Sequence, residues 1–232
     1  MLNDIAENFQ RVRDRIERAA AACGRTPEDV ALLAISKTFP AETISMAVAA
    51  GQRLFGENRV QEAESKIPRL GAVPGLEWHL VGHLQSNKAH KAAGLFDFVH
   101  SVDSAKIAAK LSQSCIETGK RMSVLLQVDL GQEPTKSGAE PADIASIMES
   151  ISTLEGIRVE GLMTIPPYFE DPELTRPYFV ALRKLGESLE TERPGCLGHR
   201  HLSMGMSHDF EVAIQEGATI VRIGTALFGS RT

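Results

Sequence analysis

Residues 30–36 read Val30-Ala-Leu-Leu-Ala-Ile-Ser36, which is apolar at nearly every position instead of at every second one. A strand that is covered on both faces has this pattern, and such strands are typical of parallel sheets flanked by helices. Seven further short apolar runs follow, at residues 52–56, 77–82, 97–102, 122–129, 157–165, 200–205 and 219–224. The sequence therefore predicts eight strands.

Stretches with helical spacing alternate with these runs, at residues 41–50, 58–67, 86–93, 104–118, 141–152, 173–190 and 207–216. Such alternation implies parallel pairing through right-handed crossovers, and eight units in 232 residues suffice to close a barrel. We predict an α/β fold, a (β/α)8 barrel of the TIM type that occupies residues 1–232 as a single domain. The competing fold is an open doubly wound sheet, but its usual GxGxxG motif after an early strand is missing.

An additional helix is predicted before the first strand, at residues 3–22. Ile5, Phe9, Val12 and Ile16 recur at helical spacing and form one apolar stripe on an otherwise charged segment. The charges also interrupt any apolar core that a signal peptide would need. We therefore expect a cytoplasmic protein.

The composition limits the classes of function. The formal net charge is −5 and both signs are spread along the chain, so we expect neither a nucleic-acid partner nor a membrane surface. No run of about 18 apolar residues is long enough to span a bilayer. Cys23, Cys115 and Cys196 lie far apart without paired spacing, so we expect neither a disulfide framework nor a zinc site.

A lysine lies where the first strand ends, in Ser36-Lys37-Thr38. In a barrel of this type the chemistry takes place at the carboxyl ends of the strands. Lys37 is either a solvent-facing charge or a partly desolvated amine that forms a Schiff base with an aldehyde.

Small and hydroxyl-bearing residues mark the ends of the last two strands, in residues 203–207 and 222–225. Loops in these positions form the recurrent phosphate site of the barrel fold, because backbone N–H groups converge there. Gly205 and Gly224 would let the main chain approach an anion, and Ser203, Ser207 and Thr225 would donate hydroxyl hydrogen bonds. The alternative is that Ser207 simply caps the next helix.

Arg222 and the histidines leave alternatives open. Arg222 is either paired with a strand carboxylate or directed at an acceptor of a ligand, because a guanidinium only donates. His199 and His201 share a strand face without a convincing third metal ligand, so we expect no metal. His79 and His83 lie at the end of the third strand, where packed neutral histidines are the commoner outcome.

Several blocks, in order along essentially the whole chain, resemble the YggS/PROSC family of pyridoxal phosphate homeostasis proteins. They are Ser36-Lys37-Thr38, Phe55-Gly-Glu-Asn58 with Val60-Gln-Glu62, Trp78-His79 through Gly82-His83-Leu-Gln-Ser-Asn-Lys88, Glu160-Gly-Leu-Met163, Leu202-Ser-Met-Gly-Met-Ser207, Val221-Arg-Ile-Gly-Thr225 and Phe228-Gly229. The resemblance implies a barrel related to the N-terminal domain of alanine racemase, which binds pyridoxal 5′-phosphate (PLP) as an aldimine.

The resemblance also implies a role for each matching residue. Lys37 would be the Schiff-base lysine, Arg222 would face the pyridine nitrogen and Asn58 would lie beside the ring. The phosphate would be held by Ser203, Gly205, Gly224 and Thr225. The Gln132-Glu133-Pro134 variant puts a ligand role of the loop around Lys136 in doubt.

Three functions fit these residues. The first is a PLP carrier that holds the cofactor reversibly without turnover, as a monomer, and passes it to PLP-dependent apoenzymes. The second is a minimal PLP-dependent amino-acid racemase. It is disfavoured because a racemase needs acid/base groups on both faces of the substrate α-carbon, and we expect no second domain after Thr232. The third is a sugar-phosphate enzyme that forms a Schiff base without PLP.

Overall fold

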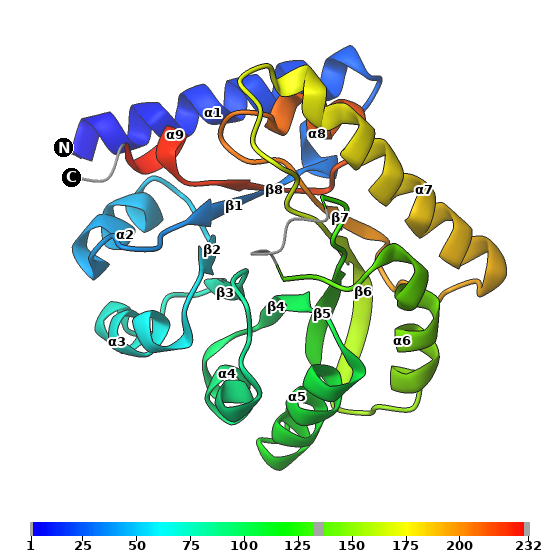
Figure 1. Ribbon diagram of the computed structural model, residues 1–232. Coiled ribbons are helices and arrows are strands. Elements are labelled where there is room, and N and C mark those ends of the chain that lie inside the picture. Colours follow the sequence, from blue (N-terminus) through cyan, green and yellow to red (C-terminus); the bar gives the residue numbers. More distant parts are fainter. Residues whose placement is uncertain (1, 132–136, 230–232) are drawn as a thin grey trace.

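Eight parallel strands close into a barrel, with strand order β1-β2-β3-β4-β5-β6-β7-β8 and β8 paired to β1. The coordinates are a computed structural model, which describes residues 2–131 and 137–229. The strands are β1 Ala31–Ile35, β2 Leu54–Glu57, β3 Glu77–Leu80, β4 Phe98–Val102, β5 Met122–Gln127, β6 Ile157–Met163, β7 His201–Ser203 and β8 Ile220–Ile223. All eight coincide with predicted runs, so the predicted barrel is confirmed (Figure 1).

The helices surround the barrel (Figure 1). They are α1 Leu2–Ala22, α2 Ala41–Ala49, α3 Val60–Leu70, α4 Ala89–Leu95, α5 Ala105–Glu117, α6 Ile144–Ile151, α7 Arg176–Glu192, α8 Phe210–Gln215 and α9 Thr225–Phe228. Short 3-10 turns cover Pro27–Asp29, Ser86–Lys88, Pro141–Asp143 and Pro172–Thr175. The last helix, α9, is a single turn of four residues, too short for the spacing of apolar residues to predict it.

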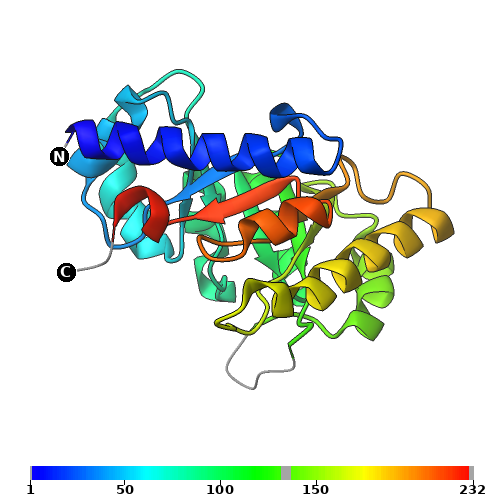
Figure 2. The ribbon, with the colours of Figure 1, turned by 90° about the horizontal axis from the view of Figure 1, so that it is seen from above.

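The predicted N-terminal helix is confirmed as α1, and it lies alongside α8 and α9 (Figures 1 and 2). Its apolar stripe is buried: Phe9 packs edge-to-face on Phe228 with ring centroids 5.8 Å apart. The Asn8 side chain also donates to the carbonyl of Leu227 at 2.9 Å. Helix α1 therefore supports α9, which begins at the end of β8. No helix in the described part of the chain combines the length and apolar character that a membrane crossing needs.

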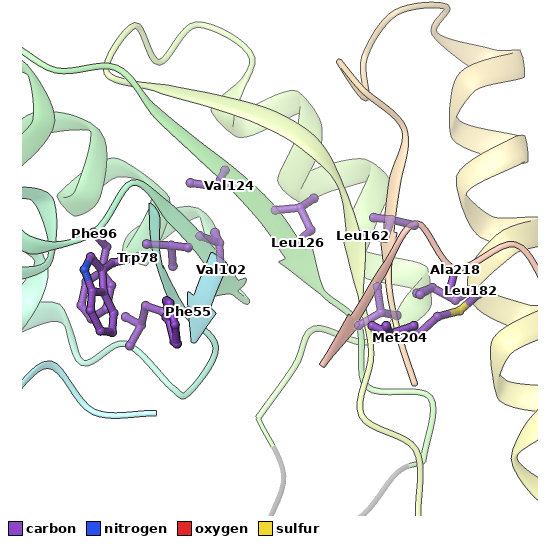
Figure 3. Packing of buried hydrophobic residues seen from close by; sticks show 14 of the residues in the cluster. Phe55, Trp78, Phe96, Val102, Val124, Leu126, Leu162, Leu182, Met204 and Ala218 are labelled. Carbon is purple, nitrogen blue, oxygen red and sulfur yellow. The ribbon is translucent and has the colours of Figure 1, made fainter. Parts of the chain in front are cut away.

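Apolar side chains form two layers because successive residues of a strand point to opposite faces. One layer lies between strands and helices and includes Phe55, Trp78 and Leu126 (Figure 3). The other fills the barrel interior and includes Leu33, Ile35, Val81, Phe98, Leu125, Met163 and Ile220. Burial on both faces explains why the strands are continuously apolar in sequence.

Candidate functional site

A cavity of about 440 Å³ opens where the strands end. Its volume lies in the range of about 300–1,000 Å³ that is usual for small-molecule sites. Five residues predicted to bind line it together, namely Lys37, Asn58, Arg222, Gly224 and Thr225. Of the described residues predicted to bind, Ser203 and Gly205 lie outside this lining.

The turn that carries Lys37 is strained and tightly held. The backbone of Thr38 adopts φ +69°, which is unusual for a β-branched residue. The N–H of Thr38 donates to the Glu62 carboxylate, and the N–H of Ser36 donates to the carbonyl of Gly56 at 3.0 Å. Both neighbours of Lys37 are thus fixed through their backbones, and the half-buried lysine is directed to the cavity.

A buried ion pair stabilises this turn from behind. Lys66 is 7% exposed, and its Nζ lies 2.9 Å from Glu57 Oε1 and 2.9 Å from the carbonyl oxygen of Ser36. The same ammonium lies 2.6 Å from Glu62 Oε1. Burial raises the pKa of the Glu57 carboxyl, and the charge of Lys66 opposes that rise. Sequence analysis missed this network, because Lys66 lies on a helix whose charges are expected to face solvent.

The turn after β7 meets the start of α9. Ser207 Oγ lies 3.3 Å from the backbone nitrogens of both Gly224 and Ala226, so its oxygen accepts from two N–H groups. Asp209, not Ser207, is the N-cap residue of α8, so the alternative interpretation of Ser207 as a cap is wrong. Ser207, Gly224 and Thr225 instead line the cavity together, where the hydroxyls of Ser207 and Thr225 are the donors.

Gly205 is required by packing. Its φ is +89°, and an added Cβ would lie 2.6 Å from Ala213 Cβ and 2.9 Å from Phe210 Cα. The glycine therefore lets α8 approach the end of β7. A direct contact of Gly205 with phosphate stays a prediction, and these distances favour an indirect role.

We expect Gly205→Ala to lower the free energy of unfolding by about 3 kcal/mol, from a left-handed backbone and an overpacked helix contact together. Urea denaturation measures the loss. Gly71→Ala is the matched control, since its φ is also positive, +66°, but no atom lies within 4 Å of the added Cβ. Equal losses in the two variants would contradict the packing role.

Arg222 is a buried cation at the bottom of the cavity. Its Nη1 donates to Ser203 Oγ and its Nη2 to the carbonyl of Thr164, each at 2.7 Å. Burial lowers the pKa of the guanidinium to about 10, against the opposing charge of Asp209, so the group stays charged at neutral pH. Both partners are neutral oxygens, which favours the alternative that Arg222 serves an acceptor of a ligand.

Ser203 is fully buried in the barrel interior, where its Oγ also lies 3.0 Å from His100 Nδ1. Its contact with phosphate stays a prediction, because its two hydrogen-bond partners indicate that it supports Arg222 instead.

Asn58 follows β2 and is half-buried. Gly82 packs on Asn58 so closely that a Cβ added to Gly82 would lie 2.1 Å from the carbonyl oxygen of Asn58.

The remaining described candidates lie at different places in the barrel, except that the rings of His199 and His201 stack with their centroids 5.5 Å apart. His83 lines the cavity with its Nδ1 3.4 Å from Asp103 Oδ2, whereas His79 is buried inside the barrel. His199 Nδ1 lies 2.8 Å from Glu160, and His201 Nδ1 lies 3.1 Å from Thr219 Oγ1. Lys136 is outside the described residues.

The cavity thus combines three chemical groups: an amine, a buried cationic donor, and a cup that carries the hydroxyls of Ser207 and Thr225 beside Gly224. An amine condenses with an aldehyde, a guanidinium requires an acceptor, and converging N–H and O–H groups suit a phosphate. A phosphorylated aromatic aldehyde with a ring nitrogen meets all three requirements.

Comparison with known proteins gives a consistent result. Residues 2–232 match the family model of the alanine racemase N-terminal domain. The chain is 45% identical over 225 residues to the pyridoxal phosphate homeostasis protein of Aquifex aeolicus, covering 97% of each chain. It is 44% identical to the protein of the same name from Escherichia coli K12, covering 99% of this chain and 98% of that one.

Solved structures agree. The structure of PipY from Synechococcus elongatus with PLP bound superposes on this chain with a TM-score of 0.85 at 41% identity. The match covers 97% of this chain and 100% of that chain. An alanine racemase from Clostridium difficile gives a TM-score of 0.73 at 17% identity, with 99% of this chain and 57% of that chain covered. The second likeness shows a shared fold only.

Proposed function

We infer that this chain, which belongs to the family of the alanine racemase N-terminal domain, binds pyridoxal 5′-phosphate and acts in PLP homeostasis. The observation that carries the inference is the convergence of Lys37, Arg222 and the Gly224–Thr225 turn on one cavity. These three features come from opposite ends of the sequence, and the pairing of β1 with β8 brings them together.

In this proposal, different residues bind different parts of the cofactor. When bound, PLP supplies an aldehyde and an electron-withdrawing ring. The Lys37 amine forms the covalent link to the aldehyde carbon with loss of one water, and addition of water reverses it. Ser207, Gly224 and Thr225 hold the phosphate, Arg222 donates to the pyridine nitrogen, and Asn58 lies beside the ring.

We propose that the chain carries out no substantial turnover. The relatives named above are homeostasis proteins by name. Arg222 is charged at neutral pH and disfavours protonation of the pyridine nitrogen, which weakens the ring as an electron sink. The proposal extends to a cytoplasmic monomer that delivers PLP to apoenzymes.

A minimal racemase remains the second candidate, because the exposed Tyr168 lines the cavity and offers a phenol near the site. Exchange of the α-proton with solvent deuterium, measured over a panel of L- and D-amino acids, separates the two functions. A carrier gives no exchange above the rate of free PLP. Rapid exchange that is lost in Tyr168→Phe supports the racemase instead.

Thr225→Val tests the phosphate cup. The change keeps the shape of the side chain and removes its hydroxyl, so we expect PLP to bind about tenfold more weakly, the usual cost of one hydrogen bond to a charged group. Equilibrium titration measures the affinity. Pyridoxal without its phosphate is the control ligand, and its affinity should not change. An equal loss for both ligands would place the phosphate elsewhere.

A further inference from the structure

A line of polar side chains crosses the interior of the barrel. His79 Nδ1 lies 2.9 Å from His100 Nε2, His100 Nδ1 lies 3.0 Å from Ser203 Oγ, and Ser203 Oγ lies 2.7 Å from Arg222 Nη1. The four residues belong to β3, β4, β7 and β8, so the line runs from one side of the barrel to the other (Figure 1). Barrel interiors are usually filled by branched apolar side chains, which makes this line unusual.

All four side chains are nearly inaccessible to solvent. The exposed fraction is 5% for His79, 4% for Arg222 and 0% for both His100 and Ser203. Phe98 packs edge-on against both imidazoles, with its ring centroid 5.1 Å from that of His79 and 4.8 Å from that of His100. Burial lowers the pKa of His100 well below its ordinary value, and the neighbouring His79 and Arg222 lower it further. His100 is therefore neutral.

Arg222 fixes the direction of every hydrogen bond in the line, because a guanidinium has no acceptor. Ser203 Oγ must accept from Arg222, so its own proton points to Nδ1 of His100. A neutral His100 then carries its proton on Nε2 and donates to Nδ1 of His79. His79 in turn carries its proton on Nε2.

The opposite direction leaves two groups unsatisfied. Nδ1–H of His100 would then donate to Ser203, whose hydroxyl proton would lose its acceptor among the described residues. An unprotonated Nε2 of His79 would face the Glu77 carboxylate, whose Oε2 lies 3.7 Å away. In the first direction that nitrogen carries a proton toward the carboxylate, and this contact lowers the pKa of Glu77. At 3.7 Å the contact is electrostatic, and this N–H has no hydrogen-bond partner among the described residues. The first direction is therefore the stable one.

We propose that His79 and His100 are positioning residues, which hold Ser203 as an oriented acceptor and thereby aim the Arg222 guanidinium at the pyridine nitrogen of PLP. The proposal rests on the proposed function for its ligand, but the line itself consists only of residues of this chain. Neither histidine lines the cavity, so the effect on the ligand is indirect. Its purpose is to keep one buried cation in one orientation, with the neutral oxygens of Ser203 and Thr164 as its acceptors.

The first test needs no cofactor. In ¹⁵N-histidine-labelled protein, long-range ¹H–¹⁵N spectra of the imidazoles report which nitrogen carries the proton. We expect His100 in the neutral Nε2–H form from pH 6 to 8, donating to Nδ1 of His79. A spectrum with His100 protonated on Nδ1, or on both nitrogens, would overturn the proposed direction.

The second test measures the aim of Arg222. It compares PLP with its 1-deaza analogue, in which the ring nitrogen is replaced by C–H. We expect the wild-type chain to prefer PLP by about tenfold, the value of a charge-assisted hydrogen bond. His100→Phe should reduce the preference to near unity, while both ligands still bind through Lys37 and the phosphate cup. His201→Phe, a histidine of the same barrel outside the line, should keep it.

The results for the wild type and for His100→Phe test two different parts of the proposal. An unchanged preference in His100→Phe overturns the positioning role, and an absent preference in the wild type shows that Arg222 does not contact the ring nitrogen. If His100→Phe does not fold, Ser203→Ala breaks the same line between His100 and Arg222 and gives the same prediction. Failure of the wild type to bind PLP refutes the proposed function, whereas the NMR test of the line is unaffected.

Discussion

Replacing Lys37 by alanine is expected to abolish the absorption band at about 420 nm that a lysine-linked PLP produces. Lys37 supplies the amine at the cavity, and the strained turn at Thr38 presents it there. The phosphate cup and Arg222 are unchanged, so the variant should still bind PLP without a covalent link. We expect its affinity to fall by about 100-fold, which corresponds to about 3 kcal/mol.

Absorption spectroscopy and an equilibrium titration measure both effects. Lys88→Ala is the matched control, because Lys88 lies near the end of β3 and lines a neighbouring cavity that shares Asn58. It should keep the band and the affinity. A full band in Lys37→Ala would mean that another lysine carries the link, and the assignment would then be wrong.

Lys66→Met is expected to lower the free energy of unfolding at pH 7 by about 3–5 kcal/mol, the usual effect of removing one partner from a buried ion pair. The Glu57 carboxylate, which is fully buried, would lose its cation. Its Oε2 atom already lacks a hydrogen-bond partner in the described part of the chain. The carbonyl of Ser36 would also lose a donor, so PLP binding should weaken as well.

The pH dependence of this loss follows from the direction of the pKa of Glu57, which burial raises above its ordinary value. A carboxyl with a raised pKa in the folded state binds its proton more tightly there than in the unfolded chain. The stability that the folded state gains from binding this proton is therefore fully present at low pH, and it is lost as the pH rises through the pKa of Glu57 in the folded state. Without Lys66 the pKa rises further, so the deficit of Lys66→Met should shrink between pH 7 and pH 5.

Urea denaturation of wild type and variant at both pH values measures this effect. Lys91→Met is the control, because Lys91 Nζ also lies 2.8 Å from a glutamate, Glu64, but both side chains are about half exposed. Its loss should be about 1 kcal/mol or less. A Lys66→Met deficit that is equally small, or that grows as the pH falls, would contradict the role of the network.

The barrel was predictable because burial on both faces leaves a strong signal in the sequence. Each strand is a short apolar run between helical segments, and all eight runs became strands. The positions of Lys37 and Arg222 at the strand ends were also predictable, since a charged residue at or inside an apolar strand is rare, whereas their roles toward a ligand stay predictions. The cavity brings both together as predicted.

The side-chain contacts of Ser203 and Lys66 were not predictable. Ser203 was assigned to phosphate because serine near glycines suggests an anion site, yet its side chain contacts His100 and Arg222 inside the barrel. Which face of a strand a residue takes depends on the register of the closed sheet, and β4 has an irregularity between Val99 and Val102. In the sequence Lys66 cannot be distinguished from a surface lysine, because only the fold brings Glu57 next to it.

The most direct test of the central claim is to load the chain with PLP, reduce it with borohydride, and locate the modified residue by peptide mass spectrometry. Reduction fixes the link between amine and aldehyde, so the mass increase marks the lysine that reaches the cofactor. We expect modification at Lys37, at one PLP for each chain. Modification at Lys66, Lys88 or Lys136 with Lys37 unmodified would contradict it.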